Sequence, residues 1–315
     1  MTNIQNHEAT KEAVKKRYRG HTVLYGKTKP QYPLSAEREF KRVTDAYIKL
    51  LNAELKKRLP QLMAAYRLHR NDAANYDDYQ DLERLAREIF LEIAAKLEQL
   101  FVKFDLGKRI SEIAQQTKKI SLREWRRVVH ETLGIDLLSE YYTDGFYEEY
   151  IRRWIDQNVL LIKSIPNQTL DTMRQIILDS YANGKLTRDV QREIQKEYLT
   201  TKQKARLLAR DQLAKLNADI SQAQQQDAGV NRYRWSDSDD ERVRKCHAEL
   251  DGQIFSWDEP PEMWYDTKSK GRVYTGRRCH PGQDICCRCV AIPVFDIDTL
   301  DLPMKGKQED GKAVQ

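Results

Sequence analysis

The first 245 residues of this chain contain no cysteine, and residues 35–226 hold only two prolines and four glycines. Scarcity of both helix breakers over such a length favours helices. No segment approaches the roughly 18 consecutive apolar residues of a membrane span, and the N-terminus lacks the apolar core of a signal peptide. We therefore expect a mainly helical protein that is made and used in the cytosol, without membrane contact.

The balance of charge is mixed rather than one-sided. The net charge of +6 is the difference between 54 basic and 48 acidic residues, which suits proximity to nucleic acid without requiring it. Mean hydropathy is low at −0.77, yet 40% of the residues are hydrophobic and 16 are tyrosine. This composition is richer in apolar and aromatic residues than that of a disordered chain, so most of the protein should fold.

The N-terminal segment, residues 1–34, is polar and basic and contains Lys15, Lys16, Arg17 and Arg19. Such a segment is typical of a flexible arm whose charges are solvated. The alternative is an arm that becomes ordered on a partner or on DNA, with these four residues as contacts.

Residues 35–228 show helical periodicity, with apolar residues at three- and four-residue steps that each line one helix face. The clearest sets are Phe40, Val43, Tyr47, Leu50 and Leu51, and then Leu82, Leu85, Ile89, Ile93, Leu97, Leu100 and Phe104. We expect helices that pair mostly as hairpins.

Local signals suggest where some of these helices begin and end. Ser121 and Glu124 form the pattern of a capping box, with Gly134 ending that helix. Pro166 is expected to end the helix that starts near Asp144. A short helix capped by Thr187 and a separate long helix from about residue 201 to 226 should follow.

After Gly229 the composition shifts to Tyr, Trp, Pro, Gly and Cys, with short alternating runs at 233–235 and 253–255 that indicate strands joined by turns. The predicted fold class is mainly α: an extended helical N-terminal region followed by a small α+β Cys/His-containing C-terminal module. The module should span residues 229–300, and residues 301–315 should form a disordered tail.

All five cysteines fall in this module, at Cys246, Cys279, Cys286, Cys287 and Cys289. Because disulfides do not normally form in a reducing compartment, the cluster indicates either a metal site or buried thiols.

Residues 231–295 also carry an ordered series of short motifs: Asp240-x-Arg242-Val243-Arg244-x-x-His247, Asp251-Gly252, Pro281-Gly282 and Cys287-Arg288-Cys289. This series resembles the phage Mu F-like domain of head morphogenesis proteins. A weaker likeness extends upstream through residues 158–166, 184–187 and 205–211, so the resemblance covers about half of the chain.

The resemblance implies a minor capsid protein of a phage head that acts in procapsid assembly at the portal and aids DNA packaging or ejection. The implied partners are the portal protein, capsid and scaffold components and packaged DNA, and the implied location is the virion head. No catalytic activity and no small-molecule substrate are carried over.

The cysteine cluster suggests zinc, because a Cys-x-Cys or Cys-x-x-Cys loop supplies two thiolate ligands from one tight turn. The candidate ligands are His247, Cys279, His280, Cys286, Cys287 and Cys289. Those that match family positions are His247, Cys287 and Cys289. A site with four protein ligands would be structural, since no position stays open for water. The alternative is a cluster of buried thiols, with His247 hydrogen-bonded in the core.

Two further readings stay open. One is a zinc-containing nucleic-acid-binding module on a helical arm, with Arg242 and Arg244 either meeting phosphate or pairing with neighbouring carboxylates. The other is a metal-dependent nuclease that uses Asp237, Asp239 and Asp240 with His247. These carboxylates lie in a polar loop without a recognisable acid–base or nucleophile pattern, so we expect no enzyme. Asp251-Gly252 and Pro281-Gly282 are predicted to be turns.

Overall fold

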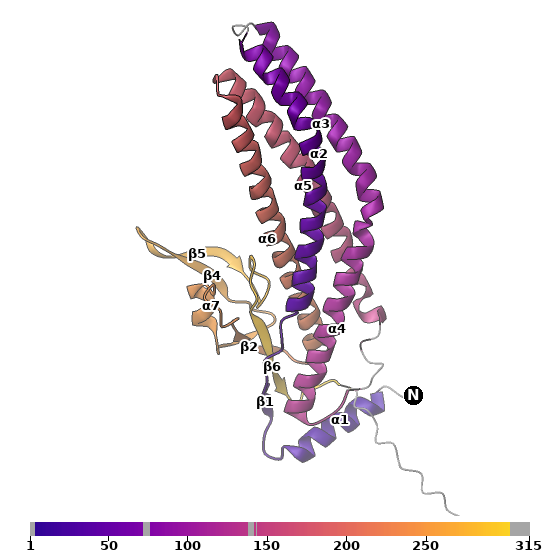
Figure 1. Ribbon diagram of the computed structural model, residues 1–315. Coiled ribbons are helices and arrows are strands. Elements are labelled where there is room, and N and C mark those ends of the chain that lie inside the picture. The colour runs from indigo at the N-terminus through magenta and orange to yellow at the C-terminus, as the bar shows by residue number, and fades with distance from the viewer. Residues whose placement is uncertain (1–3, 72–75, 138–141, 143, 303–315) are drawn as a thin grey trace, which may run out of the picture. The chain divides into compact units, whose positions relative to one another are not determined.

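A computed structural model describes residues 4–71, 76–137, 142 and 144–302 (Figure 1). The described residues form seven helices: α1 (Ile4–Arg17), α2 (Leu34–Asn71), α3 (Tyr76–Phe104), α4 (Leu106–Leu133), α5 (Asp144–Ala182), α6 (Thr187–Asp227) and α7 (Lys245–Leu250). The strands are β1 (Val23–Tyr25), β2 (Arg232–Ser236), β3 (Ile254–Ser256), β4 (Glu262–Thr267), β5 (Gly271–Arg278) and β6 (Val290–Asp296). The predicted fold class, mainly α with a small C-terminal module containing strands, is confirmed.

The chain divides into two compact units that are interleaved in sequence. A helical unit comprises residues 35–113 and 153–210, and a mixed unit comprises residues 1–34, 114–152 and 211–315. Helices α4, α5 and α6 each contribute residues to both units. The predicted boundary at Gly229 therefore differs from the structure, because the last part of α6 packs with the strands rather than with the helical unit.

The helical unit is held together by the apolar stripes that the periodicity predicts. Phe40 and Tyr47 of α2 are fully buried. Tyr47 stacks on Phe101 of α3 with ring centroids 3.9 Å apart, and Phe40 meets Trp154 of α5 edge-on at 5.5 Å. Such aromatic contacts add to the stability that burial of their area already provides.

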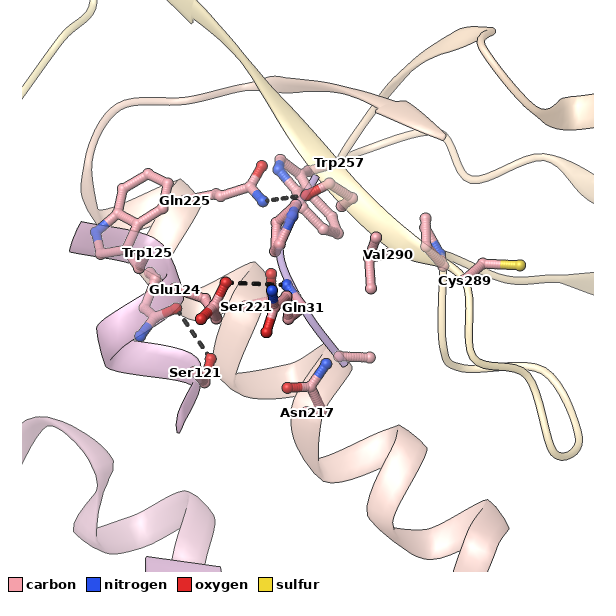
Figure 2. A pocket seen from close by; sticks show the side chains of 15 residues that line it. Gln31, Ser121, Glu124, Trp125, Asn217, Ser221, Gln225, Trp257, Cys289 and Val290 are labelled. Atoms are coloured by element: carbon pink, nitrogen blue, oxygen red, sulfur yellow. Dashed lines mark hydrogen bonds between the residues drawn. The ribbon is translucent and has the colours of Figure 1, made fainter. Parts of the chain in front are cut away.

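The mixed unit contains a four-stranded antiparallel sheet in the order β1-β6-β2-β3 and a separate two-stranded ribbon of β4 and β5. The central strand β6 is buried along nearly its whole length. The end of α4 covers it through Trp125, whose ring lies 6.0 Å from that of Phe295. The end of α6 is tied to it by a hydrogen bond from Gln225 to the Ala291 carbonyl (Figure 2).

The segment predicted to be a flexible arm, residues 1–34, instead contains a helix and a strand. Residues 4–17 form α1, and β1 pairs with β6, placing Leu24 opposite Phe295. Val14 is fully buried, and the Tyr18 hydroxyl donates a hydrogen bond to the carbonyl of Thr132 at the end of α4. The physical reason is that the buried strand β6 would otherwise have unpaired backbone N–H and C=O groups along one edge. Leaving such groups without hydrogen bonds away from water costs free energy.

Two predicted helix boundaries are wrong because tertiary packing overrides local signals. Helix α5 continues through Pro166 to Ala182, and the hydroxyl of Thr169 donates to the carbonyl of Ile165 in the turn around the proline. Helix α6 runs without a break from Thr187 to Asp227. Buried side chains along both helices keep them helical where local propensity alone predicts an interruption.

The expected capping box is also wrong. Ser121 and Glu124 lie inside α4 and not at its start. The Ser121 hydroxyl bonds to Gln224 and the Glu124 carboxylate accepts from the backbone of Gln31, whereas a capping box needs bonds to the backbone N–H groups of these two residues themselves. Gly134, with φ of +69°, follows the last residue of α4 as expected.

The end of the described chain belongs to the mixed unit. Leu302 is fully buried, and the backbone N–H of Asp301 donates to the Ala228 carbonyl. The predicted tail begins at residue 301, so the backbone of its first residue is hydrogen-bonded and its second residue is buried, whereas residues 303–315 lie outside the described ones. None of the described helices combines the length and apolarity that crossing a membrane requires.

Candidate metal centre

His247 and two cysteines reach one point from different elements. His247 lies on α7, and Cys287 and Cys289 lie on the turn that leads into β6. Two features shape this turn: the N–H of Cys287 donates to the carbonyl of Asp284, and Cys286 adopts a positive φ of 54°. Both thiols therefore leave one tight loop, which is the arrangement that a Cys-x-Cys motif offers to a metal.

The three side chains converge in a buried place. Nδ1 of His247 lies 3.6 Å from Sγ of Cys287 and 3.7 Å from Sγ of Cys289. One ligand atom from each residue lies within 4.8 Å of the other two. Each residue is at most 4% exposed, and the Trp235 ring centroid lies 5.6 Å from that of His247. The centre is thus enclosed by the aromatic core of the module.

The opposite edge of the imidazole faces a carboxylate. Nε2 of His247 lies 3.3 Å from Oδ2 of Asp284, without the alignment of a full hydrogen bond. Asp284 is 4% exposed and pairs with Arg244 at 3.0 Å and with Arg277 at 2.8 Å. A buried carboxylate behind a histidine orients the ring and favours the tautomer with its lone pair on the other nitrogen, here Nδ1.

The charges around Asp284 decide its ionisation. Burial alone would raise the pKa of its carboxyl group, but His247, the backbone of Ile285 and the two arginines lower that pKa to about 2. Asp284 is therefore an anion at neutral pH, and its negative charge faces the N–H at Nε2 of His247.

The two thiols and the imidazole shift one another's pKa values. The Cys289 thiol donates to the sulfur of Cys287 and, with His247, lowers the pKa of Cys287 despite its burial. The same interaction and burial raise the pKa of Cys289. Burial lowers the pKa of His247, but Asp284 and Cys287 outweigh it and raise that pKa to about 9. These shifts favour the thiolate form of Cys287 and the protonated form of His247.

The spacing of the three atoms fits tetrahedral zinc. Zn–N and Zn–S bonds of about 2.1 and 2.3 Å at a tetrahedral angle place nitrogen and sulfur about 3.6 Å apart. The observed separations of 3.6 and 3.7 Å match this distance. The set is also chemically suitable, since two thiolates and one imidazole are ligands that zinc prefers.

The other three candidate ligands are placed elsewhere. Nδ1 of His280 lies 2.9 Å from the Tyr233 hydroxyl, and the backbone N–H of Cys286 donates to Asp211 of α6. Cys279 is partly buried against the cluster that contains Cys287 and Cys289, but it is not part of the group of converging ligand atoms. Among the described residues, only His247, Cys287 and Cys289 form a group of this kind. The expected closure by four protein ligands is therefore not found in the part of the chain that the structure describes.

The remaining motif residues support the geometry of the centre. Arg244 binds Asp284 and the Ile285 carbonyl rather than a neighbouring carboxylate, whereas Arg242 is exposed. Arg288 pairs with Asp240 at 3.6 Å. These contacts fasten the loop that follows β2 to the loop that carries the cysteines.

Two motif glycines have positive φ angles, and Pro281 beside one of them is buried. Gly252 has φ of +76°, and Gly282 has φ of +86°. A Cβ on Gly282 would lie 3.0 Å from the Cβ of Ala218 in α6, so the absence of a side chain allows the loop to approach the helix.

The carboxylates of the nuclease alternative are occupied by other partners. Asp237 accepts from the N–H of Asp239, Asp239 pairs with Lys29 at 2.7 Å, and Asp240 pairs with Arg288. In the described chain they do not gather with His247 into a potential metal group.

The basic residues of the N-terminal segment divide into two pairs. Lys15 forms an ion pair with Asp298 at 2.8 Å, and Arg17 donates to the Gly134 carbonyl. Lys16 and Arg19 are exposed. Lys15 and Arg17 thus hold α1 against the rest of the mixed unit. This weakens the prediction that all four basic residues serve as DNA contacts.

A small cavity lies between the ends of α4 and α6 and the strands. Figure 2 shows Trp125 and Glu124 on one side, Gln225 and Trp257 at the top and Asn217 at the bottom. Its volume of about 20 Å³ holds little more than one water molecule, so the cavity is too small for an organic ligand.

Sequence reasoning missed Asp284 and Arg277 as parts of the centre. The available signal was the position of Asp284 three residues before Cys287, because a metal-binding histidine usually has a carboxylate or carbonyl behind it. Arg277 lies on β5 and left no comparable signal, since only folding brings it to Asp284.

Comparisons with known proteins agree with the motifs. A protein of Haemophilus influenzae (strain ATCC 51907 / DSM 11121 / KW20 / Rd), described as an uncharacterized protein, is 40% identical over 163 residues, which cover 52% of this chain and 33% of that protein. The chain thus spans about a third of the length of the curated relative it matches. No solved structure matches the chain. Residues 171–292 match the family described as Phage Mu protein F like protein, so this part of the chain is similar to that family.

Proposed function

We propose that the protein is a minor head protein of a phage that acts in head morphogenesis, in procapsid assembly at the portal. The observation that carries this proposal is the match of residues 171–292 to the phage Mu F-like family, a range that includes α6, strands β2 to β5 and the candidate metal centre. Its partners would be the portal protein and capsid or scaffold components, and its location would be the virion head. In this role the protein would aid DNA packaging or ejection.

The described site supports a binding role better than a catalytic one. Asp239, Asp240 and Asp284 are paired with Lys29, Arg288 and Arg244, and the cavity beside the sheet has room for about one water. A catalytic site needs an accessible reacting group and space for a substrate. We therefore propose that the protein works by association and not as an enzyme.

The test is assembly with the portal protein of the same phage. Tagged protein is co-expressed with the portal protein, purified through the tag at moderate salt and sized by light scattering. The proposal predicts a stable complex of defined mass. Free protein, with the portal protein absent from the purified fraction, would contradict it.

We also propose that His247, Cys287 and Cys289 bind one zinc ion. The support is the match between the observed N···S separations and tetrahedral zinc, together with the buried carboxylate behind His247. Zinc would link α7 to the loop before β6 and add folding free energy to a small module. With three protein ligands, its fourth ligand would be a water or a donor outside the described residues.

The zinc proposal is tested on reduced full-length protein by native mass spectrometry and by elemental analysis. One zinc per chain is expected, and Cys287→Ser and Cys289→Ser should each lose it. Cys279→Ser is the matched control, since it removes a thiol of the same module that lies outside the group. Metal-free wild-type protein, or zinc retained by both ligand variants, would overturn the proposal.

A further inference from the structure

The ribbon formed by β4 and β5 differs from the rest of the mixed unit. The two strands pair with each other, with Trp264 opposite Tyr274 and Asp266 opposite Arg272, and form a sheet of their own. Figure 1 shows the ribbon projecting away from β2 and β6. Every residue from Tyr265 to Arg272 is exposed or only partly buried, so the outer half of the ribbon has no protein cover in the described chain.

Positive charge is concentrated on this ribbon. Residues 262–278 contain five cationic residues and two acidic ones, a net charge of +3, whereas the whole chain carries +6. Half of the net charge therefore lies in a segment of seventeen residues. Such a local excess on a projecting element is the electrostatic pattern of a polyanion-binding surface.

Only part of this charge is used within the protein. Arg272 pairs with Glu249 at 2.7 Å and lies 3.7 Å from the centre of the Trp264 ring, and Arg277 pairs with Asp284. The remaining cations of the ribbon are Lys268, Lys270 and Arg278. All three are exposed, and within the described residues none has an ion pair; Arg278 donates a hydrogen bond to the Pro260 carbonyl at 3.3 Å.

The ribbon also presents two exposed tyrosines. Tyr265 is 53% exposed and Tyr274 is 57% exposed. Tyr274 lies opposite Trp264 and Tyr265 lies opposite Val273, so the two rings leave opposite faces of the ribbon. In duplex DNA the bases stay stacked on one another, but tyrosine hydroxyls next to cations can still form hydrogen bonds with phosphate and sugar oxygens.

From these observations we infer that the β4–β5 ribbon is a binding site for double-stranded DNA, with Lys268, Lys270 and Arg278 on the phosphates. A two-stranded ribbon is narrow enough to enter the major groove, which is about 12 Å wide. Binding is sequence-independent, because the three cations contact the backbone. This site is separate from the basic residues of α1 and does not depend on the portal proposal.

The experiment measures the salt dependence of DNA binding by full-length protein. A fluorescent duplex of random sequence is titrated by anisotropy at several salt concentrations, and log Kd is plotted against log salt. The triple variant Lys268→Ala/Lys270→Ala/Arg278→Ala is expected to bind more weakly, with a slope reduced by about 2.7, or about 0.9 for each phosphate contact removed.

The matched control is Lys49→Ala/Lys196→Ala/Lys204→Ala, which removes three exposed lysines of the helical unit and the same amount of charge. Its slope should equal that of wild type. Equal slopes for the ribbon variant and wild type, or no duplex binding by wild type, would overturn the inference. Tighter binding of single strands than of duplex would overturn the groove assignment.

A parallel measurement keeps the two proposals distinguishable. The ribbon variant should still form the complex with the portal protein, because the inference assigns its three cations to DNA phosphates and not to the portal protein. If the variant binds DNA like wild type but loses the portal complex, the ribbon is a protein-binding surface and the DNA assignment is wrong.

Discussion

Asp284 lies 3.3 Å from Nε2 of His247, on the side of the imidazole opposite the thiols of Cys287 and Cys289. The carboxylate orients the imidazole ring of His247 and favours a lone pair on Nδ1, the nitrogen that faces the two sulfur atoms. It also connects the centre to Arg244 and Arg277, which hold the carboxylate in place.

The first prediction concerns this carboxylate. Asp284→Asn should weaken zinc binding by about 10- to 100-fold, because the amide no longer fixes the ring or increases the basicity of Nδ1. The measurement is zinc competition with a chromophoric chelator, with circular dichroism to verify folding. Asp266→Asn, which breaks the exposed pair with Lys245, is the control and should bind zinc as wild type does. An unchanged affinity in Asp284→Asn would show that the carboxylate does not position His247.

The second prediction tests the close contact between α6 and the end of the described chain. Gly229 has φ of +72°, and a Cβ there would lie 1.9 Å from the backbone oxygen of Thr299. Gly229→Ala should lower the free energy of unfolding by about 2 kcal/mol or more, because a steric clash adds to the left-handed backbone cost. Urea unfolding measures it.

Gly252→Ala is the matched control for this substitution. Gly252 has a similar φ of +76°, but a Cβ there would meet nothing within 4 Å. Only the backbone cost of about 1 kcal/mol should remain. Equal losses in the two variants would show that the approach of Thr299 does not matter.

The third prediction is a pH dependence that originates at Glu124. Burial would raise the pKa of this carboxyl group, but Arg127, the N–H of Gln31 and Arg123 together lower it. A carboxyl group with a lowered folded-state pKa stabilises the protein fully above its unfolded-state pKa of about 4.3 and loses that contribution as pH falls through the folded value. The stability difference between wild type and Glu124→Gln should therefore be constant near neutral pH and shrink below about pH 4.3.

The measurement is thermal or urea unfolding of both proteins across this pH range. Glu112→Gln removes an exposed carboxylate from the same helix and is the control with which the Glu124→Gln difference is compared at each pH. A difference for Glu124→Gln that grows as the pH falls would contradict the assigned direction.

The fourth prediction tests the docking of α1. Val14 is fully buried, so Val14→Asp places a charge in an apolar site and should release the helix. Limited proteolysis should then cut within residues 4–17 faster than in wild type. Lys16→Asp introduces the same side chain at an exposed position of α1 and should leave the cleavage rate nearly unchanged. Equal rates for the two variants would mean that α1 is not held by Val14.

Much of the fold follows from local sequence features. The stripes that contain Phe40, Tyr47 and Leu82 predict helices because only the helical period places them on one face, and these residues are buried as expected. The glycines at 134 and 252 adopt the positive φ angles that their sequence context suggests. The local pattern fails at Pro166, where packing along α5 outweighs the preference of a single residue.

The sequence by itself determined which chemistry is available: a cysteine-rich, phage Mu F-like C-terminal region with thiols and imidazoles, and helices before it. Only the tertiary structure decided that His247, Cys287 and Cys289 meet while His280 turns to Tyr233, and that β1 pairs with β6. The physical reason is distance along the chain: forty residues separate His247 from Cys287, and their approach depends on how α7, the loop and Asp284 pack, which no local pattern encodes.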